Sequence, residues 1–257
     1  MDRLRLIILK YIQNNTFKNS KGVIFLTKYA SEKIQKSCGP LDHITIIPHG
    51  VDEIFRTKTL APDLDGAPQI RALYISNALP YKHHCEVIEA ISELRKIGLD
   101  ISIDLVGGGT GAAQFRLKNK INELDPKKAF IRQHPFVQKT KLPEFLSKSH
   151  LFVFASSCEN MPNTLVEAMA SGLPIACSSR GPMPEVLKDT GQYFNPEKSA
   201  SIITAIKNIL ENPKKSRIQA KKAQKLASQY SWERCADETL NFLKMTNIMI
   251  EIQSKGR

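Results

Sequence analysis

From residue 72 onward, short apolar runs alternate with longer stretches in which apolar residues recur every three or four positions. Apolar runs of this kind are typical of buried strands, and recurrence at helical spacing is typical of helices packed on one side. Strands that are apolar on both faces indicate a parallel sheet covered by helices on both sides. The sequence therefore predicts an α/β fold with a doubly wound parallel sheet, in which right-handed crossovers limit the topology.

The predicted elements follow this alternation. We expect strands at 23–26, 44–47, 72–75, 101–106, 130–131, 151–154, 174–177 and 192–194. We expect helices at 29–36, 84–97, 112–124, 142–148, 163–171, 184–188, 198–211 and 214–246. The first residues form only a short amphipathic stretch, and residues 56–70, rich in Pro, Asp, Gly and Ala, are predicted to be a linker.

The chain carries 37 Lys and Arg against 25 Asp and Glu, a formal net charge of +12, with cationic clusters at 1–36, 116–148 and 214–225. Nucleic acid, an anionic membrane surface or a phosphate-bearing substrate would suit this charge. The alternative is that each cluster is the solvated face of a helix. Nucleic acid is not expected, because no recognised module is present and aromatic residues are not interleaved with the basic runs.

No apolar run approaches the roughly 18–20 residues needed to span a bilayer, and the start lacks the features of a signal peptide. The five cysteines lack zinc or redox spacing and are typical of buried thiols in a reducing compartment. They are Cys38, Cys85, Cys158, Cys177 and Cys235. We therefore expect a cytoplasmic protein, with peripheral contact to the inner membrane face as one option for the basic clusters.

The most informative stretch, 156–174, follows the predicted strand 151–154 and holds two carboxylates, Glu159 and Glu167. We place Glu159 in the strand-to-helix loop and Glu167 in the first turns of the helix. The N-terminus of a helix has unsatisfied N–H groups and the positive end of the dipole, which suits a phosphate. Carboxylates accept hydrogen bonds from hydroxyls. The pattern indicates a site for a phosphate beside the hydroxyls of a sugar or a ribose.

This stretch resembles the signature of the retaining glycosyltransferases of family 4, also called group 1. In that signature a Glu and, after seven residues, a second Glu precede Ala-Met-Ala-x-Gly-x-Pro, as Glu159, Glu167 and residues 168–174 do here. Four further stretches match in order, at 48–52, 74–82, 106–109 and 230–233. The resemblance covers roughly residues 20–245 and implies the GT-B fold, a Rossmann-like fold with two facing α/β domains.

The resemblance implies roles for individual residues. Glu159 and Lys82 are the expected catalytic residues, of which Glu159 holds the transferred sugar and Lys82 neutralises the donor diphosphate. Glu167 is expected to bind the ribose. The remaining expected substrate-binding residues are Asn77, Gly108, Phe136 near the base, and the phosphate-cradling stretch Met161, Pro162, Asn163, Thr164 and Leu165. The family's chemistry implies retention of configuration without a metal or other cofactor, with the leaving diphosphate stabilised electrostatically.

The alternative for each of these residues is a structural role without ligand binding. In that case Glu159 is a capping acid, Glu167 an exposed helical acid and Lys82 a solvated loop residue. Ser76 and Asn77 stand where the family usually has Gly-Arg, and Asn77 can donate a hydrogen bond but adds no charge.

Two further signals are weaker. We expect His83, His84 and His134 to be surface histidines, because no acid spacing around them supports a metal site. Asp63 and Asp65 match a metal motif in form only, since they lie in the linker.

The resemblance also implies a division of the chain. Residues 1–55 would be a partial α/β remnant of an N-terminal acceptor domain, 71–228 the nucleotide-sugar donor domain, and 229–257 a helix crossing back to the remnant. The expected activity is transfer of a sugar from a nucleoside diphosphate sugar to a lipid- or polysaccharide-linked acceptor. The alternative is a non-catalytic binding subunit, or a fragment that needs a partner chain for the N-terminal domain. Each case predicts exposed apolar surface near 1–50 and 229–250.

Overall fold

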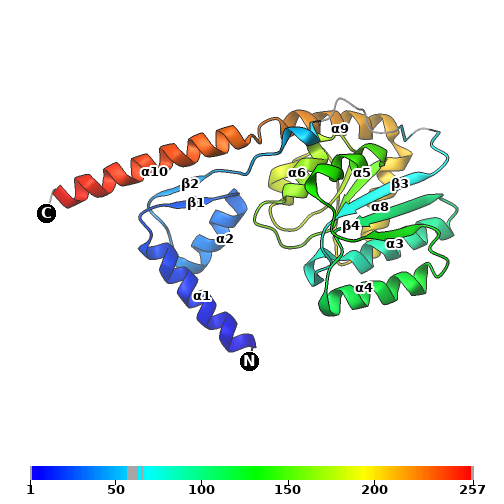
Figure 1. Cartoon of the computed structure of the whole chain (residues 1–257), viewed down its shortest axis with the longest axis horizontal. Coiled ribbons are helices and arrows are strands. Elements are labelled where there is room, and N and C mark those ends of the chain that lie inside the picture. The colour runs from blue at the N-terminus through cyan, green and yellow to red at the C-terminus, as the bar shows by residue number, and fades with distance from the viewer. Residues whose placement is uncertain (1, 57–62, 65, 256–257) are drawn as a thin grey trace. The chain divides into compact units, whose positions relative to one another are not determined.

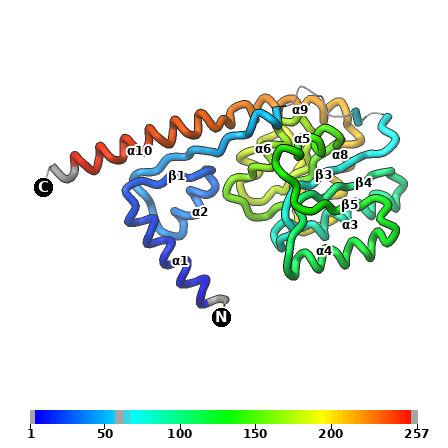
Figure 2. Tube along the Cα trace, in the orientation of Figure 1, coloured from blue at the N-terminus to red at the C-terminus, as the bar shows by residue number. Residues whose placement is uncertain are grey.

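The computed structural model describes residues 2–56, 63–64 and 66–255, which fold as two compact units. The first unit combines Met1–Gly50 with Tyr230–Arg257, and the second comprises Val51–Gln229. Figure 1 and Figure 2 show the path of the chain through both units. Part of the predicted linker 56–70, namely residues 57–62 and 65, lies outside the described residues. Among the described residues, no helix combines the length and apolar character needed to span a bilayer.

The second unit is built on a six-stranded sheet with the order β5-β4-β3-β6-β7-β8, in which all neighbours are parallel. The strands are β3 (Ile70–Ile75), β4 (Ile101–Val106), β5 (Ile131–His134), β6 (Leu151–Phe154), β7 (Ile175–Ser178) and β8 (Gln192–Phe194). Chain order reverses between β3 and β6, so this is the switch point of a doubly wound sheet. The predicted fold class is confirmed for this unit.

Helices cover both faces of this sheet (Figure 1). On one face, α3 (His84–Lys96) packs against α4 (Gly111–Leu124) and α8 (Ser199–Glu211). On the other, α6 (Asn163–Ala170) packs against α9 (Pro213–Ala227), and α5 (Leu142–Lys148) contacts β3. The short helix α7 (Met183–Leu187) also packs against α6. The strands are apolar because both faces are covered, and Leu73, Tyr74 and Phe152 have no exposed surface.

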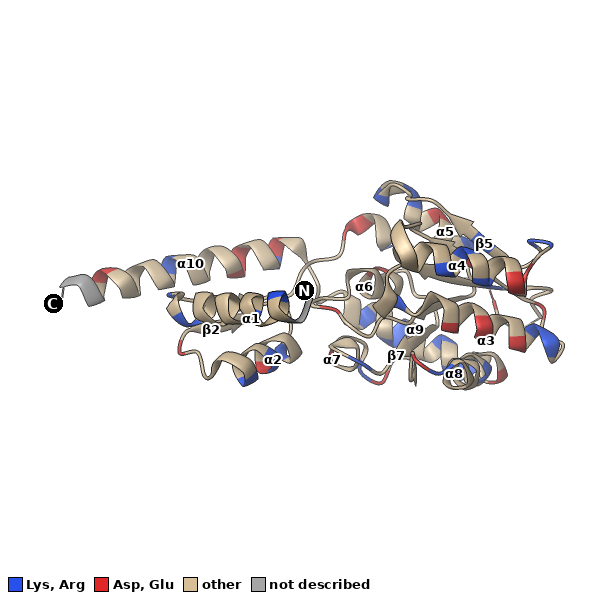
Figure 3. Cartoon of the chain, turned by 90° about the horizontal axis from the view of Figure 1, so that it is seen from below, with Lys and Arg blue, Asp and Glu red and all other residues tan. Residues whose placement is uncertain are grey.

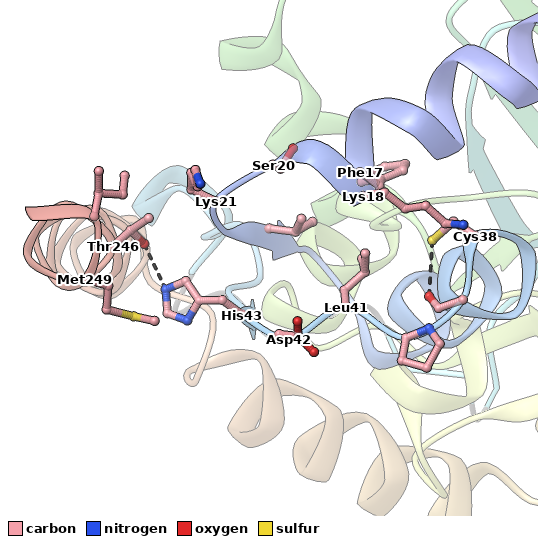
Figure 4. Close-up of a pocket in the computed structure, with 14 residues that line it drawn as sticks. Phe17, Lys18, Ser20, Lys21, Cys38, Leu41, Asp42, His43, Thr246 and Met249 are labelled. Carbon is pink, nitrogen blue, oxygen red and sulfur yellow. Dashed lines mark hydrogen bonds between the residues drawn. The ribbon is translucent and has the colours of Figure 1, made fainter. Parts of the chain in front are cut away.

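The first unit is a small α/β assembly. It contains α1 (Asp2–Asn19), β1 (Val23–Phe25), α2 (Lys28–Cys38), β2 (Ile44–Ile46) and α10 (Trp232–Lys255), and β1 pairs with β2 in parallel. Helix α10 packs near the start of β2, where the His43 ring stacks on Phe242 and His43 Nε2 lies 2.9 Å from Thr246 Oγ1. These residues border a pocket of about 430 Å³ (Figure 4).

The first unit exposes much apolar surface, as predicted. On α1 the exposed apolar side chains are Leu4, Leu6, Ile7, Ile8, Leu9, Tyr11 and Ile12. On α10 they are Trp232, Leu240, Leu243, Met245, Ile248, Met249, Ile250 and Ile252. The buried cluster that balances this surface is small, with Val23, Phe25 and Ala30 at its centre.

Several boundaries differ from the prediction. Residues 2–19 form a full helix rather than a short amphipathic stretch, and β3 begins at Ile70 rather than 72. The predicted single helix 214–246 is two helices, because residues 228–231 separate α9 from α10. The segment 51–55, assigned to the first part of the chain, belongs to the second unit, where Phe55 is fully buried and its carbonyl accepts a 3.2 Å hydrogen bond from Ser171 Oγ.

Candidate functional site

The loops that follow β3 and β6 meet at the switch point of the second sheet. The two strands are adjacent, and their carboxyl ends open at the same edge. The Ser157 amide donates a 2.9 Å hydrogen bond to the carbonyl of Tyr81, so the backbones of the two loops are joined directly. His83, in the left-handed region with φ of 50°, places its Nε2 2.9 Å from Ser157 Oγ. Residues 74 and 76 positions apart are thereby fixed side by side.

This junction brings together Lys82 and Glu159, the two predicted catalytic residues. The Lys82 ammonium forms an ion pair and hydrogen bond with Glu159 Oε1, and their side chains are only 15% and 16% exposed. The Lys82 Nζ also lies 5.4 Å from the ring centroid of Tyr81 and 5.9 Å from that of Phe154. Because both side chains are largely shielded from solvent, water screens their charges only weakly, and each group can act on a charged or hydroxylated ligand.

Two buried ring side chains, Tyr74 and His84, pack against the loop that carries Lys82. The hydroxyl of Tyr74 donates a 2.7 Å hydrogen bond to the carbonyl of Lys82, and the His84 ring stacks on Tyr74 with centroids 4.7 Å apart. Burial lowers the pKa of His84 to about 4, so its imidazole is neutral at pH 7. His84 is only 5% exposed, which corrects the prediction that it is a surface histidine. Because α3 begins at His84, this polar side chain packs against Tyr74, next to the loop that carries Lys82.

The turn at the start of α6 has a mixed character. The Met161, Pro162 and Leu165 side chains are buried, whereas Asn163 is exposed and Thr164 is half-buried. Two amides of this turn already donate to local carbonyls, Asn163 N to Met161 O and Leu165 N to Pro162 O, each at 3.0 Å. Binding by residues 161–165 therefore stays a prediction that depends on the main chain rather than on the buried side chains.

Glu167 lies one turn into α6 in a separate environment. Burial raises the pKa of its carboxyl to about 7, while Lys139 lowers that pKa and Asp52 raises it. Lys139 Nζ is 3.3 Å from Asp52 Oδ2, and Asp52 caps the short helix Glu53–Phe55 that packs on α6. Within the described chain, no hydrogen bond or ion pair joins Glu167 to the Lys82–Glu159 pair. The carboxyl is poised to lose its proton when hydrogen-bond donors approach.

A third group of predicted residues lines a hollow of about 730 Å³ at the ends of β3, β4 and β5. Asn77, Gly108 and Phe136 border it together with His134. The Phe136 side chain is 78% exposed, so its ring face is open to a planar ligand. Two glutamines also line the hollow and pair reciprocally, with amide-to-amide hydrogen bonds of 3.0 and 2.9 Å between Gln114 and Gln133.

Glycine is required where these loops touch. A Cβ on Gly107 would lie 2.6 Å from the carbonyl oxygen of Ser76. The backbone φ of Gly107 is +137°, a conformation that would be strained for any residue with a side chain. A Cβ on Gly109 would lie 3.0 Å from that of Ala78, and the Gly109 φ is +154°. The glycines of 107–109 thus have a packing role, and the loop after β4 is pressed against the loop after β3.

Some contributors to this site were not predicted from the sequence. Tyr74 and Ser157 lie in stretches that resemble the family, but their contacts were not predicted, because these depend on the pairing of β3 with β6. His83 was predicted to be a surface histidine, and its side chain is only 13% exposed. His134 was predicted to be a surface histidine, but its Nε2 lies 2.7 Å from Asp104 Oδ1, beside a two-pronged contact from Arg132 to the same carboxylate. Asp63 of the formal metal motif pairs instead with Arg217, while Asp65 lies outside the described residues.

Comparison with known proteins assigns this arrangement to a family. The family described as glycosyl transferases group 1 matches residues 64–226, more than half of the chain. The chain belongs to this family. The matched range contains the Lys82–Glu159 pair, Glu167 and the hollow beside Phe136, so every part of the candidate site lies in the group 1 region.

Individual relatives agree with this assignment. The chain is 26% identical over 174 residues to O-antigen chain mannosyltransferase B of Escherichia coli, covering 68% of this chain and 45% of that protein. It is 26% identical over 217 residues to the GDP-mannose-dependent α-(1-6)-phosphatidylinositol monomannoside mannosyltransferase of Mycolicibacterium smegmatis, covering 76% and 54%. The chain thus spans about half the length of these relatives.

Solved structures show the same fold. HepE of Anabaena, in complex with UDP and glucose, superposes with a TM-score of 0.80 at 19% identity, covering 91% of this chain and 66% of that one. Sucrose-phosphate synthase of Thermosynechococcus elongatus gives a TM-score of 0.77 at 19% identity, covering 96% and 62%.

Proposed function

We propose that this chain is the donor-binding half of a glycosyltransferase that transfers a sugar from a nucleoside diphosphate sugar to a lipid- or polysaccharide-linked acceptor. The observation that carries the proposal is the pairing of Lys82 with Glu159 at the switch point, with both side chains largely shielded from solvent. A cation there can neutralise a diphosphate, and the carboxylate beside it can accept hydrogen bonds from sugar hydroxyls. The names of the group 1 relatives, which include enzymes of O-antigen and phosphatidylinositol mannoside synthesis, support this acceptor class.

The rest of the donor is proposed to lie along the same edge of the sheet. The Phe136 ring and the hollow beneath it would receive the base, and Asn77 and Gly108 would approach the phosphates or ribose. Glu167 would accept hydrogen bonds from the ribose diol, for which its carboxyl must be ionised. HepE, which shares the fold, has been solved with UDP and glucose, and this supports a nucleotide sugar as the donor class.

In the proposed mechanism, the bond between the sugar and the diphosphate breaks as positive charge develops on the sugar carbon and negative charge on the leaving oxygen. The acceptor hydroxyl oxygen then forms a bond to that carbon on the face that the diphosphate leaves, and the hydroxyl proton passes to the leaving diphosphate oxygen. Lys82 stabilises the negative charge of the leaving diphosphate electrostatically. Glu159 holds the sugar hydroxyls and so fixes the sugar against the diphosphate. We propose that configuration is retained, as the resemblance to the family implies. We also propose that no metal is required, because Lys82 supplies the positive charge.

Binding and turnover are tested separately. Thermal unfolding with a panel of uridine and guanosine diphosphate sugars should show a rise in melting temperature for at least one donor. Release of nucleoside diphosphate should then appear when acceptor and, if needed, an acceptor-domain chain are added, and should persist in EDTA. Retention would be read from the anomeric configuration of the product by NMR. If no donor raises the melting temperature, the proposed site is wrong.

A binding module without turnover is the second candidate, and the exposed apolar surface of the first unit favours it for the isolated chain. Among its described residues, that unit has two short strands and no further sheet to cover its helices. A separate chain that supplies an acceptor domain would complete it. Donor binding without nucleoside diphosphate release, restored by such a chain, would identify this case.

A further inference from the structure

One face of α9 is strongly basic. The helix has no acidic residue and carries Lys214, Lys215, Arg217, Lys221, Lys222 and Lys225. At about 100° per residue, Lys214, Lys221 and Lys225 fall on one stripe, and the other three flank it. All six side chains belong to exposed residues. Figure 3 shows the Lys and Arg of this helix in blue.

The charge on this face is largely uncompensated. Within the described part of the chain, Arg217 forms an ion pair with Asp63, and the five lysines form none. By contrast, some lysines on other helices are paired, as Lys207 is with Glu211 on α8 and Lys120 of α4 is with Glu89 and Glu123. The α9 lysines therefore keep their full charge for a partner outside the chain.

The opposite face of α9 is buried in the core of the second unit. Ala220, Ala223 and Ala227 are at most 3% exposed, and small side chains let the helix lie close to α6. Gln224 Nε2 donates a 3.1 Å hydrogen bond to the carbonyl of Ala170 at the end of α6. The basic stripe therefore points away from α6, the helix that carries Glu167.

An apolar side chain interrupts the basic stripe. Ile218, one turn from Lys214, is 57% exposed and lies between the stripe lysines. A helix that lies on a bilayer surface combines cationic residues with apolar side chains that enter the headgroup region. Single-stranded RNA would call for aromatic side chains for stacking, and α9 has none. We propose that this face of α9 docks on an anionic phospholipid surface.

The proposal is tested by co-sedimentation of the full chain with vesicles. Binding is measured to phosphatidylcholine vesicles with 30 mol% phosphatidylglycerol, as a chosen composition of about one third anionic lipid, and to pure phosphatidylcholine. The test variant replaces Lys214, Lys221 and Lys225 with Gln. The matched control replaces three exposed lysines elsewhere on the same unit, Lys118, Lys127 and Lys198, with Gln, so both variants lose the same net charge.

We expect the chain to prefer the anionic vesicles, and the preference to fall with added salt. Each basic residue near such a surface contributes roughly fivefold in binding, so the stripe variant should lose at least about tenfold and the control less than about threefold. Ile218→Ser should weaken binding about twofold or more without changing the salt dependence. Equal losses in both triple variants, or unchanged binding of a stripe variant whose circular dichroism is native, would overturn the proposal. Salt-sensitive binding of the stripe to an RNA oligonucleotide but not to vesicles would also overturn it.

Discussion

At the scale of single residues, the Lys82–Glu159 pair is the part of the site most sensitive to substitution. A charge-assisted contact to a ligand contributes about 1.5–3 kcal/mol, so Lys82→Met should weaken binding of a nucleoside diphosphate about 10- to 100-fold. Glu159→Gln should instead reduce discrimination between donor sugars, with a smaller effect on the nucleoside diphosphate alone. Isothermal titration with paired donors measures both, and equal small effects would contradict the assigned roles.

Glu167 gives a pH dependence of opposite sign for stability and for binding. Burial raises its pKa in the folded chain to about 7, above the ordinary value of 4.5. Since the folded state holds this proton more tightly, stability should fall as pH rises from 4.5 to 7, by on the order of 2 kcal/mol. Glu167→Gln should remove that loss in urea unfolding across the range. Donor binding should strengthen as the carboxyl ionises, and Glu167→Ala should weaken it at pH 8.

His84 predicts a loss of stability on the acid side. Burial holds its pKa at about 4, below the ordinary value of 6.5, so the unfolded chain binds protons more readily between these values. Stability should therefore decline as pH falls from 6.5 to 4, by roughly 3 kcal/mol. Replacing His84 with Phe, which can keep the stacking on Tyr74, should flatten this decline in urea unfolding relative to the unchanged chain. An unaltered acid slope in the variant would show that His84 is not the group responsible.

At the scale of elements, the site depends on loops pressed together at one edge of the sheet. The approach of Gly107 to the carbonyl of Ser76 leaves no room for a methyl group. Gly107→Ala should therefore cost about 2 kcal/mol or more and lower the melting temperature by several degrees. The same change at Gly98, which has a φ of +94° but open space around it, is the control that isolates the close approach. A similar loss at both positions would attribute the effect to backbone strain alone.

The sequence was sufficient to predict the elements of the second unit and its motif residues, but not the contacts that join them. Apolar periodicity located β4, β6, β8 and α5 to the residue, because polar or turn residues lie within two positions of both ends of each. The contacts of Tyr74, His83 and Ser157 could not be predicted, because they depend on β3 and β6 being neighbouring strands. His84 was misassigned, because a polar residue at a helix start is normally solvated. In α1, apolar residues on nearly every side obscured the helical period.

At the scale of the whole molecule, the apolar surface of the first unit should control association. Helices α1 and α10 expose apolar side chains around much of their circumference, and a bilayer would cover only one side of such a helix. A polypeptide surface is the better match, so the isolated chain should self-associate with rising concentration. Replacing Leu6, Ile8 and Ile12 with Gln should raise the monomer fraction in analytical ultracentrifugation while leaving nucleotide binding intact. A monomeric unaltered chain at high concentration would contradict this.

The first unit is assembled from the two ends of the chain, Met1–Gly50 and Tyr230–Arg257, with the whole of Val51–Gln229 between them. During translation the opening segment therefore emerges long before the helix against which His43 and Gly22 pack. At about 5–20 residues per second this delay is roughly 10–40 seconds. Throughout that interval residues 2–50 lack the helix that they contact in the folded unit, so their apolar side chains stay uncovered while the residues in between fold.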